Sequence, residues 1–229
     1  MEIRLDDKVA VVTGGSRGIG AATVKLFAEC GAHVIFSYRQ SAQAAAAVVE
    51  SSPGRRERVT ALRSEVSKMA DARRLIGAAV RRFGRLDLLV ANAGIWPAAP
   101  APFERMTEST WNEMMAINLK GVFAVIRQAL PHMIERKSGR IIVVSSTAGQ
   151  RGEAFHADYA ASKGALISLV KSLAAELATH RILVNCVAPG WVDTDMSKPV
   201  LNARVEARRI KAGIPLRRAG RPEDLVWCN

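Results

Sequence analysis

Residues 8–20 read KVAVVTGGSRGIG, and this stretch decides the fold. The apolar, mostly β-branched run at 9–12 predicts a buried strand, and the apolar spacing across 17–30 predicts a helix. Gly14, Gly18 and Gly20 therefore occupy a strand-to-helix turn, where glycine lets a phosphate approach main-chain N–H groups. An ordinary glycine-rich turn is the alternative, because the spacing differs from the G-x-G-x-x-G fingerprint of the best-known dinucleotide folds.

A second set of residues indicates proton transfer. Tyr159 and Lys163 lie one turn apart in residues 157–178, whose leucine spacing predicts a helix, so they share a face. An ammonium beside a phenol favours the phenolate, and we expect Lys163 to lower the pKa of Tyr159 from about 10. Ser146 follows the apolar run 141–144, so we expect its hydroxyl at the carboxyl end of a strand, within reach of a substrate oxygen. Taken singly, a packed aromatic and a strand-end cap are the alternatives.

In this order, the motifs resemble the main branch of the short-chain dehydrogenase/reductase family, and most closely its 3-oxoacyl-acyl-carrier-protein reductase subgroup. The matching elements are T-G-x-x-x-G-x-G at 13–20, N-A-G at 92–94, asparagine at 118, S-x-x-G at 146–149, Y-x-x-x-K at 159–163 and P-G at 189–190. The resemblance implies a three-layer, doubly wound Rossmann-type α/β fold, with helices on both faces of a parallel sheet. We expect a single dinucleotide-binding and catalytic domain over residues 1–229.

The resemblance also implies residue roles. Tyr159 would be the general acid/base, Lys163 would tune it and hold the nicotinamide ribose, and Ser146 would bind the substrate oxygen. Asn118 would kink its helix and support a proton-relay water. The residues expected to bind the cofactor are Gly14, Ser16, Arg17, Gly18, Ile19, Gly20, Ser37, Arg39, Glu65, Val66, Asn92, Ala93, Gly94, Tyr159, Lys163, Pro189, Gly190, Val192 and Thr194.

Charge predicts which cofactor is used. The expected second strand ends in Ser37-Tyr38-Arg39, without an acid. An Asp or Glu at that point holds the ribose 2′-OH of NAD, whereas an Arg accommodates the 2′-phosphate of NADP. Arg17 is a second guanidinium suited to phosphate. We therefore predict NADPH in preference to NADH; the alternative is that both arginines are solvated surface charges.

One residue departs from the family pattern at the adenine pocket. Glu65-Val66 stands where the family commonly has Asp-Val. We expect the longer carboxylate of Glu65 to accept a hydrogen bond from the adenine amino group.

Composition limits the classes of protein to which the chain can belong. The chain has 229 residues, 49% of them hydrophobic, enough for one sizeable core. There is no signal-peptide pattern, and the uncharged residues 88–103 contain several prolines, so we expect no membrane span. Cys30, Cys186 and Cys228 have no metal-ligand spacing, which favours a cytoplasmic protein without a metal. The net charge of +12 comes without a nucleic-acid recognition motif.

Basic residues are dense at 204–221, and a solvated surface is the simple interpretation. In the family this segment covers the substrate mouth, where a basic lid would attract a phosphopantetheine or coenzyme A thioester or an acidic acyl carrier protein. We therefore expect a small-molecule or carrier-bound ketone, with a 3-oxoacyl thioester first. The alternatives are another secondary alcohol, of sugar or steroid type, and a nucleotide-binding protein with little or no turnover.

The family pattern continues past residue 229 into one further strand. We therefore expect the strand at 181–187 to lie at an open edge of the sheet, which is an aggregation template. On that basis we expect the homo-oligomer usual in the family to be weakened here.

Overall fold

The structure is a computed structural model that describes residues 4–97 and 99–226. Its described part contains one parallel sheet in the order β3-β2-β1-β4-β5-β6. The strands are β1 (Val9–Val12), β2 (His33–Tyr38), β3 (Val59–Arg63), β4 (Leu88–Ala91), β5 (Gly139–Val144) and β6 (Ile182–Val187). The strand order reverses at β1, whose neighbours are β2 and β4.

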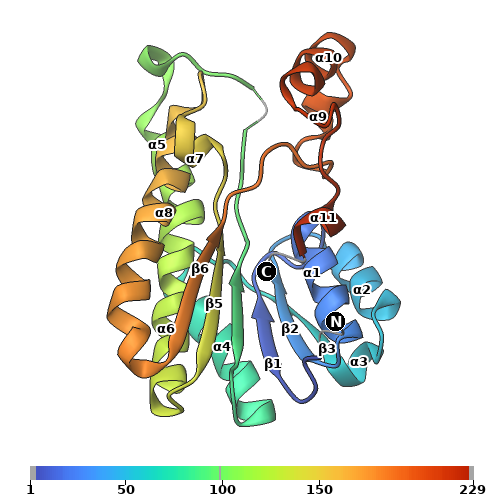
Figure 1. The fold of residues 1–229 in the computed structure, drawn as a ribbon, viewed down its shortest axis with the longest axis vertical. Helices are drawn as coiled ribbons and strands as arrows, with labels where there is room; N and C mark the ends of the chain where they lie inside the picture. Colours follow the sequence, from blue (N-terminus) through green and yellow to red (C-terminus); the bar gives the residue numbers. More distant parts are fainter. Residues whose placement is uncertain (1–3, 98, 227–229) are drawn as a thin grey trace.

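Helices cover both faces of the sheet, as Figure 1 shows. One face carries α1 (Gly18–Glu29) and α2 (Ala42–Ser51), and the other carries α4 (Met69–Phe83), α6 (Gly121–Glu135) and α8 (Ala157–Leu177). The shorter elements are α3 (Arg55–Arg58), η1 (Phe103–Arg105), α5 (Glu108–Met115), η2 (Ala116–Lys120), α7 (Ala148–Arg151), η3 (Ala178–His180), α9 (Lys198–Leu201), α10 (Arg204–Gly213) and α11 (Pro222–Val226). The predicted three-layer, doubly wound fold is confirmed.

Each central strand divides its side chains between two cores. Val9 and Val11 of β1 pack with residues of α4, α6 and α8, whereas Ala10 and Val12 pack with residues of α1 and α2. Because both faces are buried, the strand reads as a continuous apolar run rather than an alternating one.

The segments that follow the strands lie at one end of the sheet. The carboxyl ends of the parallel strands face α5 and α7 on one side and α9 and α10 on the other (Figure 1). In an open α/β sheet, ligands bind beyond these ends, at the point where the strand order reverses. Within the described ranges, no helix is both long enough and apolar enough to cross a bilayer.

Strand β6 forms one edge of the sheet. Among the described residues it pairs with β5 alone, as expected from the sequence. Its outward side chain Leu183 is 54% exposed.

The glycine turn between β1 and α1 is shaped by close contacts. Gly14 and Gly18 have φ values of +69° and +55°, which side-chain-bearing residues rarely adopt. A Cβ on Gly20 would lie 2.3 Å from the Gly14 carbonyl oxygen. The first turn of α1 therefore packs directly on the glycine turn.

This contact predicts that Gly20→Ala destabilises the protein. Overpacking of a tight contact typically costs about 1–3 kcal/mol, and here the neighbouring atom is backbone. Thermal unfolding should show a lower Tm for Gly20→Ala than for Gly213→Ala, whose added Cβ meets nothing within 4 Å. Equal Tm values for the two variants would contradict the proposed contact.

Candidate active site

The glycine turn presents main-chain donors to the crevice. No side chain caps the N-terminus of α1 at Arg17, and the first N–H groups of a helix have no partner within it. Such a terminus stabilises an anion through its N–H groups and its dipole. The turn therefore fits a pyrophosphate, as the sequence predicts.

Ser37 supports this turn from behind. Its side chain is 1% exposed, and its Oγ accepts from Gly14 N at 3.2 Å. Its carbonyl oxygen accepts from Gly15 N at 2.9 Å. The buried hydroxyl holds the turn in place, and a direct contact between Ser37 and a cofactor stays a prediction.

The N-A-G motif fastens the turn to the end of β4. Asn92 Nδ2 donates to the carbonyl oxygens of Thr13 and Gly14, at 2.9 and 3.2 Å. Thr13 Oγ1 accepts from the backbone N–H groups of Asn92 and Ala93, both at 3.0 Å. A Cβ on Gly94 would lie 3.1 Å from Asn118 Oδ1, so this glycine lets the loop approach the catalytic side.

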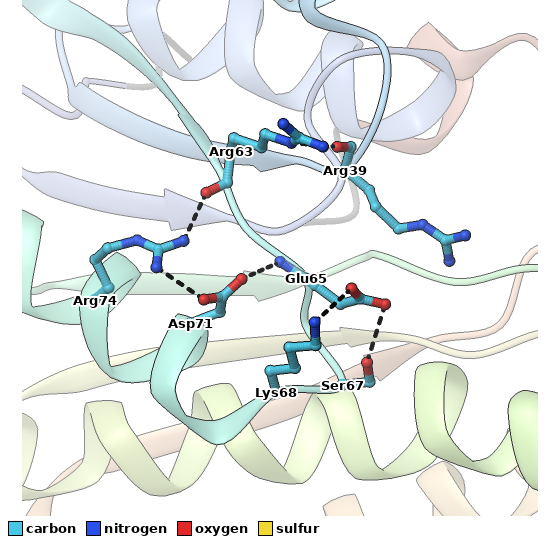
Figure 2. Close-up of polar contacts among 7 residues, drawn as sticks. All are labelled: Arg39, Arg63, Glu65, Ser67, Lys68, Asp71 and Arg74. Atoms are coloured by element: carbon cyan, nitrogen blue, oxygen red, sulfur yellow. Dashed lines mark hydrogen bonds and ion pairs between the residues drawn. The ribbon is translucent and has the colours of Figure 1, made fainter.

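Two exposed guanidinium groups flank the turn. Arg39 follows β2, and Figure 2 shows its side chain extending away from the other labelled residues. In the described part of the chain, neither Arg39 nor Arg17 pairs its side chain with an acid. Sequence analysis did not name Arg63 among the residues near the cofactor site. Arg63 ends β3, and its Nε donates to the Arg39 carbonyl oxygen at 3.3 Å. Its position at the carboxyl end of a strand was the available signal.

Glu65 is occupied by local contacts. Its carboxylate lies 3.3 Å from Lys68 Nζ and 3.4 Å from Ser67 Oγ (Figure 2). Its backbone N–H donates to Asp71 Oδ2 at 2.7 Å, and this bond lowers the pKa of Asp71. Val66 packs on Gly121, where a Cβ would lie 3.0 Å from Val66 Cγ2. The adenine contact of Glu65 stays a prediction.

The P-G loop returns over the glycine turn. The Pro189 carbonyl oxygen accepts from Thr147 N at 3.0 Å. Thr194 Cγ2 would lie 3.1 Å from a Cβ on Gly18. Val192 is buried and bridges to Gly220. The predicted segments at 13–20 and 189–194 thus meet in space.

Lys163 is held at the end of β5. Its ammonium donates to the Val144 carbonyl oxygen at 2.9 Å and lies 5.7 Å from the centre of the Tyr159 ring. Burial lowers the pKa of Lys163 to about 8. Ser145 Oγ donates to the Lys163 carbonyl oxygen at 2.7 Å, so strand and helix are bonded in both directions.

The pKa of Tyr159 corrects an expectation from sequence. It is raised above its usual value, first by burial and also by the Glu153 carboxylate, while a hydrogen bond with Ser146 lowers it. The expected lowering by Lys163 is wrong for this structure, because burial dominates and the ammonium donates to Val144 instead. A raised pKa keeps the phenol protonated at neutral pH, which is the state a general acid needs.

Asn118 is a positioning residue in this geometry. It is 0% exposed and lies in η2, a π-helical turn of the kind often found at functional sites. Its Oδ1 accepts from Ile95 N at 2.8 Å, and its Nδ2 donates to Ile95 O at 2.9 Å. The same Nδ2 donates to Ser162 Oγ at 3.2 Å. The π-helical turn agrees with the expected kink, and the relay water stays a prediction.

The substrate mouth contains aromatic rings and a carboxyl group. The Trp96 ring lies 4.9 Å from that of His156 and meets Trp191 edge-on at 5.6 Å. Burial raises the pKa of Glu153, and the Trp96 indole N–H partly offsets this by hydrogen bonding. Sequence reasoning missed Glu153 and His156, although both fall between Ser146 and Tyr159. The substrate mouth is therefore aromatic with a polar side at Glu153.

A backbone hydrogen bond joins the two loops at the substrate mouth. Ala101 N donates to the Phe155 carbonyl oxygen at 2.9 Å, and Phe155 has a φ of +66°. Positive φ is an outlier for a bulky residue.

Within the described ranges, no group of three or more His, Cys, Asp or Glu side chains is placed to hold a metal ion.

Comparisons with known proteins agree with this geometry. The family model described as short chain dehydrogenase matches residues 8–204. The 3-oxoacyl-[acyl-carrier-protein] reductase FabG of Chlamydia pneumoniae is 40% identical, over 99% of this chain and 89% of that protein. The acetoacetyl-CoA reductase of Synechocystis sp. is 37% identical, over 100% of this chain and 89% of that protein. The crystal structure of gox2181 matches with a TM-score of 0.93 at 33% identity, over 99% of this chain and 88% of that one.

The charge of Glu153 generates a prediction for the pH profile of turnover. Glu153→Gln removes a carboxylate that raises the pKa of Tyr159, so this pKa should fall. Because a phenol that acts as a general acid must be protonated, the alkaline limb of the kcat/KM profile should move to lower pH. Glu176→Gln, on the exposed side of α8, is the control and should leave the limb in place. An unmoved limb in Glu153→Gln would show that its charge does not reach the phenol.

Proposed function

This chain belongs to the short-chain dehydrogenase family, and from that premise we propose that it reduces the ketone of a 3-oxoacyl thioester with NADPH. Membership makes it an NAD(P)-dependent oxidoreductase. The observation that carries the proposal is the meeting of Ser146, Tyr159 and Lys163 beside the end of β5. The substrate class draws its support from two relatives whose names specify 3-oxoacyl and acetoacetyl thioesters.

The side chains divide the proposed reaction between them. A nicotinamide cofactor, when bound, supplies the hydride that reduces the carbonyl carbon. Tyr159 donates its phenolic proton to the carbonyl oxygen, so that C=O, hydride and proton together give the secondary alcohol. The Ser146 hydroxyl donates a hydrogen bond to the same oxygen as negative charge develops on it.

Lys163 contributes positive charge at the base of the site. With its pKa lowered to about 8, the ammonium is still mostly protonated at neutral pH. It stabilises the phenolate that remains after Tyr159 has given up its proton. Its approach to Gly94 and Asn118 also brings it to the side of the crevice where the cofactor ribose is expected.

One observation favours a second candidate substrate. Glu153 places a carboxyl group at the mouth, beside Trp96 and Tyr159, and a carboxylate accepts hydrogen bonds from hydroxyl groups. A sugar-type secondary alcohol is therefore the alternative. A panel of thioesters and keto sugars, followed by NADPH absorbance, separates the two. Failure of the whole panel would favour a nucleotide-binding protein without turnover.

The partners are part of the same proposal. Coenzyme A and an acidic acyl carrier protein are both candidate carriers of the ketone, and the +12 charge favours either. The homo-oligomer and the cytoplasmic location stay predictions.

The assignment of the acid predicts that Tyr159→Phe abolishes turnover and leaves cofactor binding largely intact. Ser146→Ala should lower kcat about a hundredfold or more, as is typical when an oxyanion donor is lost. Turnover is measured by NADPH absorbance with an acetoacetyl thioester, and cofactor binding by the shift in Tm. Robust ketone reduction by Tyr159→Phe would show that another group is the acid.

The two free guanidinium groups predict the cofactor. Arg39→Asp should lower the ratio of kcat/KM for NADPH to that for NADH by about tenfold or more, equivalent to about 1.4 kcal/mol. The new acid repels the 2′-phosphate and accepts from the ribose hydroxyl of NADH. Arg73→Asp makes the same charge change on exposed α4 and should not alter the ratio. A wild-type protein that already favours NADH would overturn the charge argument.

A further inference from the structure

A basic groove lies on α10, outside the site described above. Its cavity volume is about 530 Å³. Three of its cations, Arg204, Arg208 and Lys211, follow helical spacing and so share one face. The complete lining is Arg204, Ala207, Arg208, Lys211, Ala212 and Arg217. It contains four cations and no acid.

The positive charge of this groove is not neutralised locally. The nearby acids Glu206 and Asp224 pair with Arg209 and Arg218, at 3.1 and 2.7 Å, and neither of these arginines lines the groove. Across the described ranges, Arg204, Arg208 and Lys211 form no ion pair. Like charges gathered in a concavity raise the local positive potential and attract an anion.

The chain segment that carries the groove contacts the active-site crevice at both of its ends. The chain leaves the crevice after Thr194, which touches Gly18, and returns at Gly220. Gly220 N donates to Trp191 O and Asp193 N donates to Gly220 O, both at 2.8 Å. The segment carrying α9 and α10 therefore leaves and rejoins the mouth loop, and Figure 1 shows it standing beyond the carboxyl ends of the strands.

The basic side chains around the groove favour a phosphorylated ligand. Ala207 and Ala212 leave space between the cations, and the Arg217 guanidinium is tied to the Ala212 carbonyl oxygen. Guanidinium groups bind phosphate oxygens in a bidentate manner. A coenzyme A thioester carries a diphosphate and a further phosphate on its ribose, all far from the reacting ketone.

We propose that the α10 groove binds the phosphate groups of a coenzyme A thioester while its acyl end is reduced at Tyr159. This subsite rests on the proposed ketone reduction. It explains why Arg204, Arg208 and Lys211 lie on one face of α10 without an acidic partner among the described residues. A docking surface for an acidic carrier protein is the competing outcome of the test.

The experiment compares two substrates with the same reacting end, of which only one carries phosphates. Acetoacetyl-CoA and acetoacetyl-N-acetylcysteamine present the same ketone and the same thioester. In the double variant Arg208→Glu/Lys211→Glu, KM for the first should rise about tenfold or more, equivalent to about 1.4 kcal/mol. KM for the second and kcat for both should not change. Arg209→Glu is the control, since it reverses one charge on the same helix at a residue outside the groove.

Two further measurements make the test independent of folding and of turnover. Arg208→Gln/Lys211→Gln should give a smaller shift in the same direction, and added salt should weaken the use of acetoacetyl-CoA by the wild type more than by either double variant. Free coenzyme A should bind the wild type in calorimetry and bind the Glu double variant more weakly. This binding does not require that any ketone be reduced.

The outcomes that would overturn the subsite differ from the one that would overturn the proposed function. Equal losses on both substrates, or an unchanged KM for acetoacetyl-CoA, would overturn the subsite. A loss confined to a carrier-protein thioester would overturn it in favour of protein docking. Absence of coenzyme A binding to the wild type would also overturn it. Failure of the wild type to reduce acetoacetyl-N-acetylcysteamine would instead overturn the proposed function itself.

Discussion

The site depends on a buried lysine held between a helix and a strand. Lys163 donates from its ammonium to the Val144 carbonyl oxygen, and its own carbonyl oxygen accepts from Ser145. Gly149 makes this approach possible, because a Cβ there would lie 2.5 Å from the Lys163 carbonyl carbon. Burial opposes the charge of the ammonium, so the pKa of Lys163 falls. The protein thus places an unfavourable buried charge where proton transfer is proposed.

Polar clamps extend from this point to the glycine turn. Asn118 pairs with both backbone groups of Ile95, and Asn92 pairs with the carbonyl oxygens of Thr13 and Gly14. The loop after β4 is bonded at both ends, once to Asn118 of η2 and once to the glycine turn. Polar side chains that bond to backbone in this way specify one arrangement of the surrounding loops.

The two sides of the mouth carry opposite electrostatic character. Glu153 contributes an acidic group beside the aromatic ring of Trp96, whereas Arg204, Arg208 and Lys211 of α10 form no ion pair with any described residue. A substrate that spans both sides would place its uncharged reacting end near Glu153 and its anionic end on α10. Charge at the mouth therefore favours one orientation of the thioester that we propose as substrate.

The sequence by itself determined the glycine turn, the doubly wound sheet and the pairing of Tyr159 with Lys163 on one helical face. The turn and the pairing depend on local spacing, which the chain carries wherever it folds, whereas the doubly wound sheet was expected from the family resemblance. Tertiary structure alone decided the direction of the Tyr159 pKa, because burial and the Glu153 charge come from segments that meet only on folding. It likewise turned Ser37 inward and brought Arg217 to the cations of α10. Contacts between distant segments set desolvation and charge proximity, and no local pattern encodes either of them.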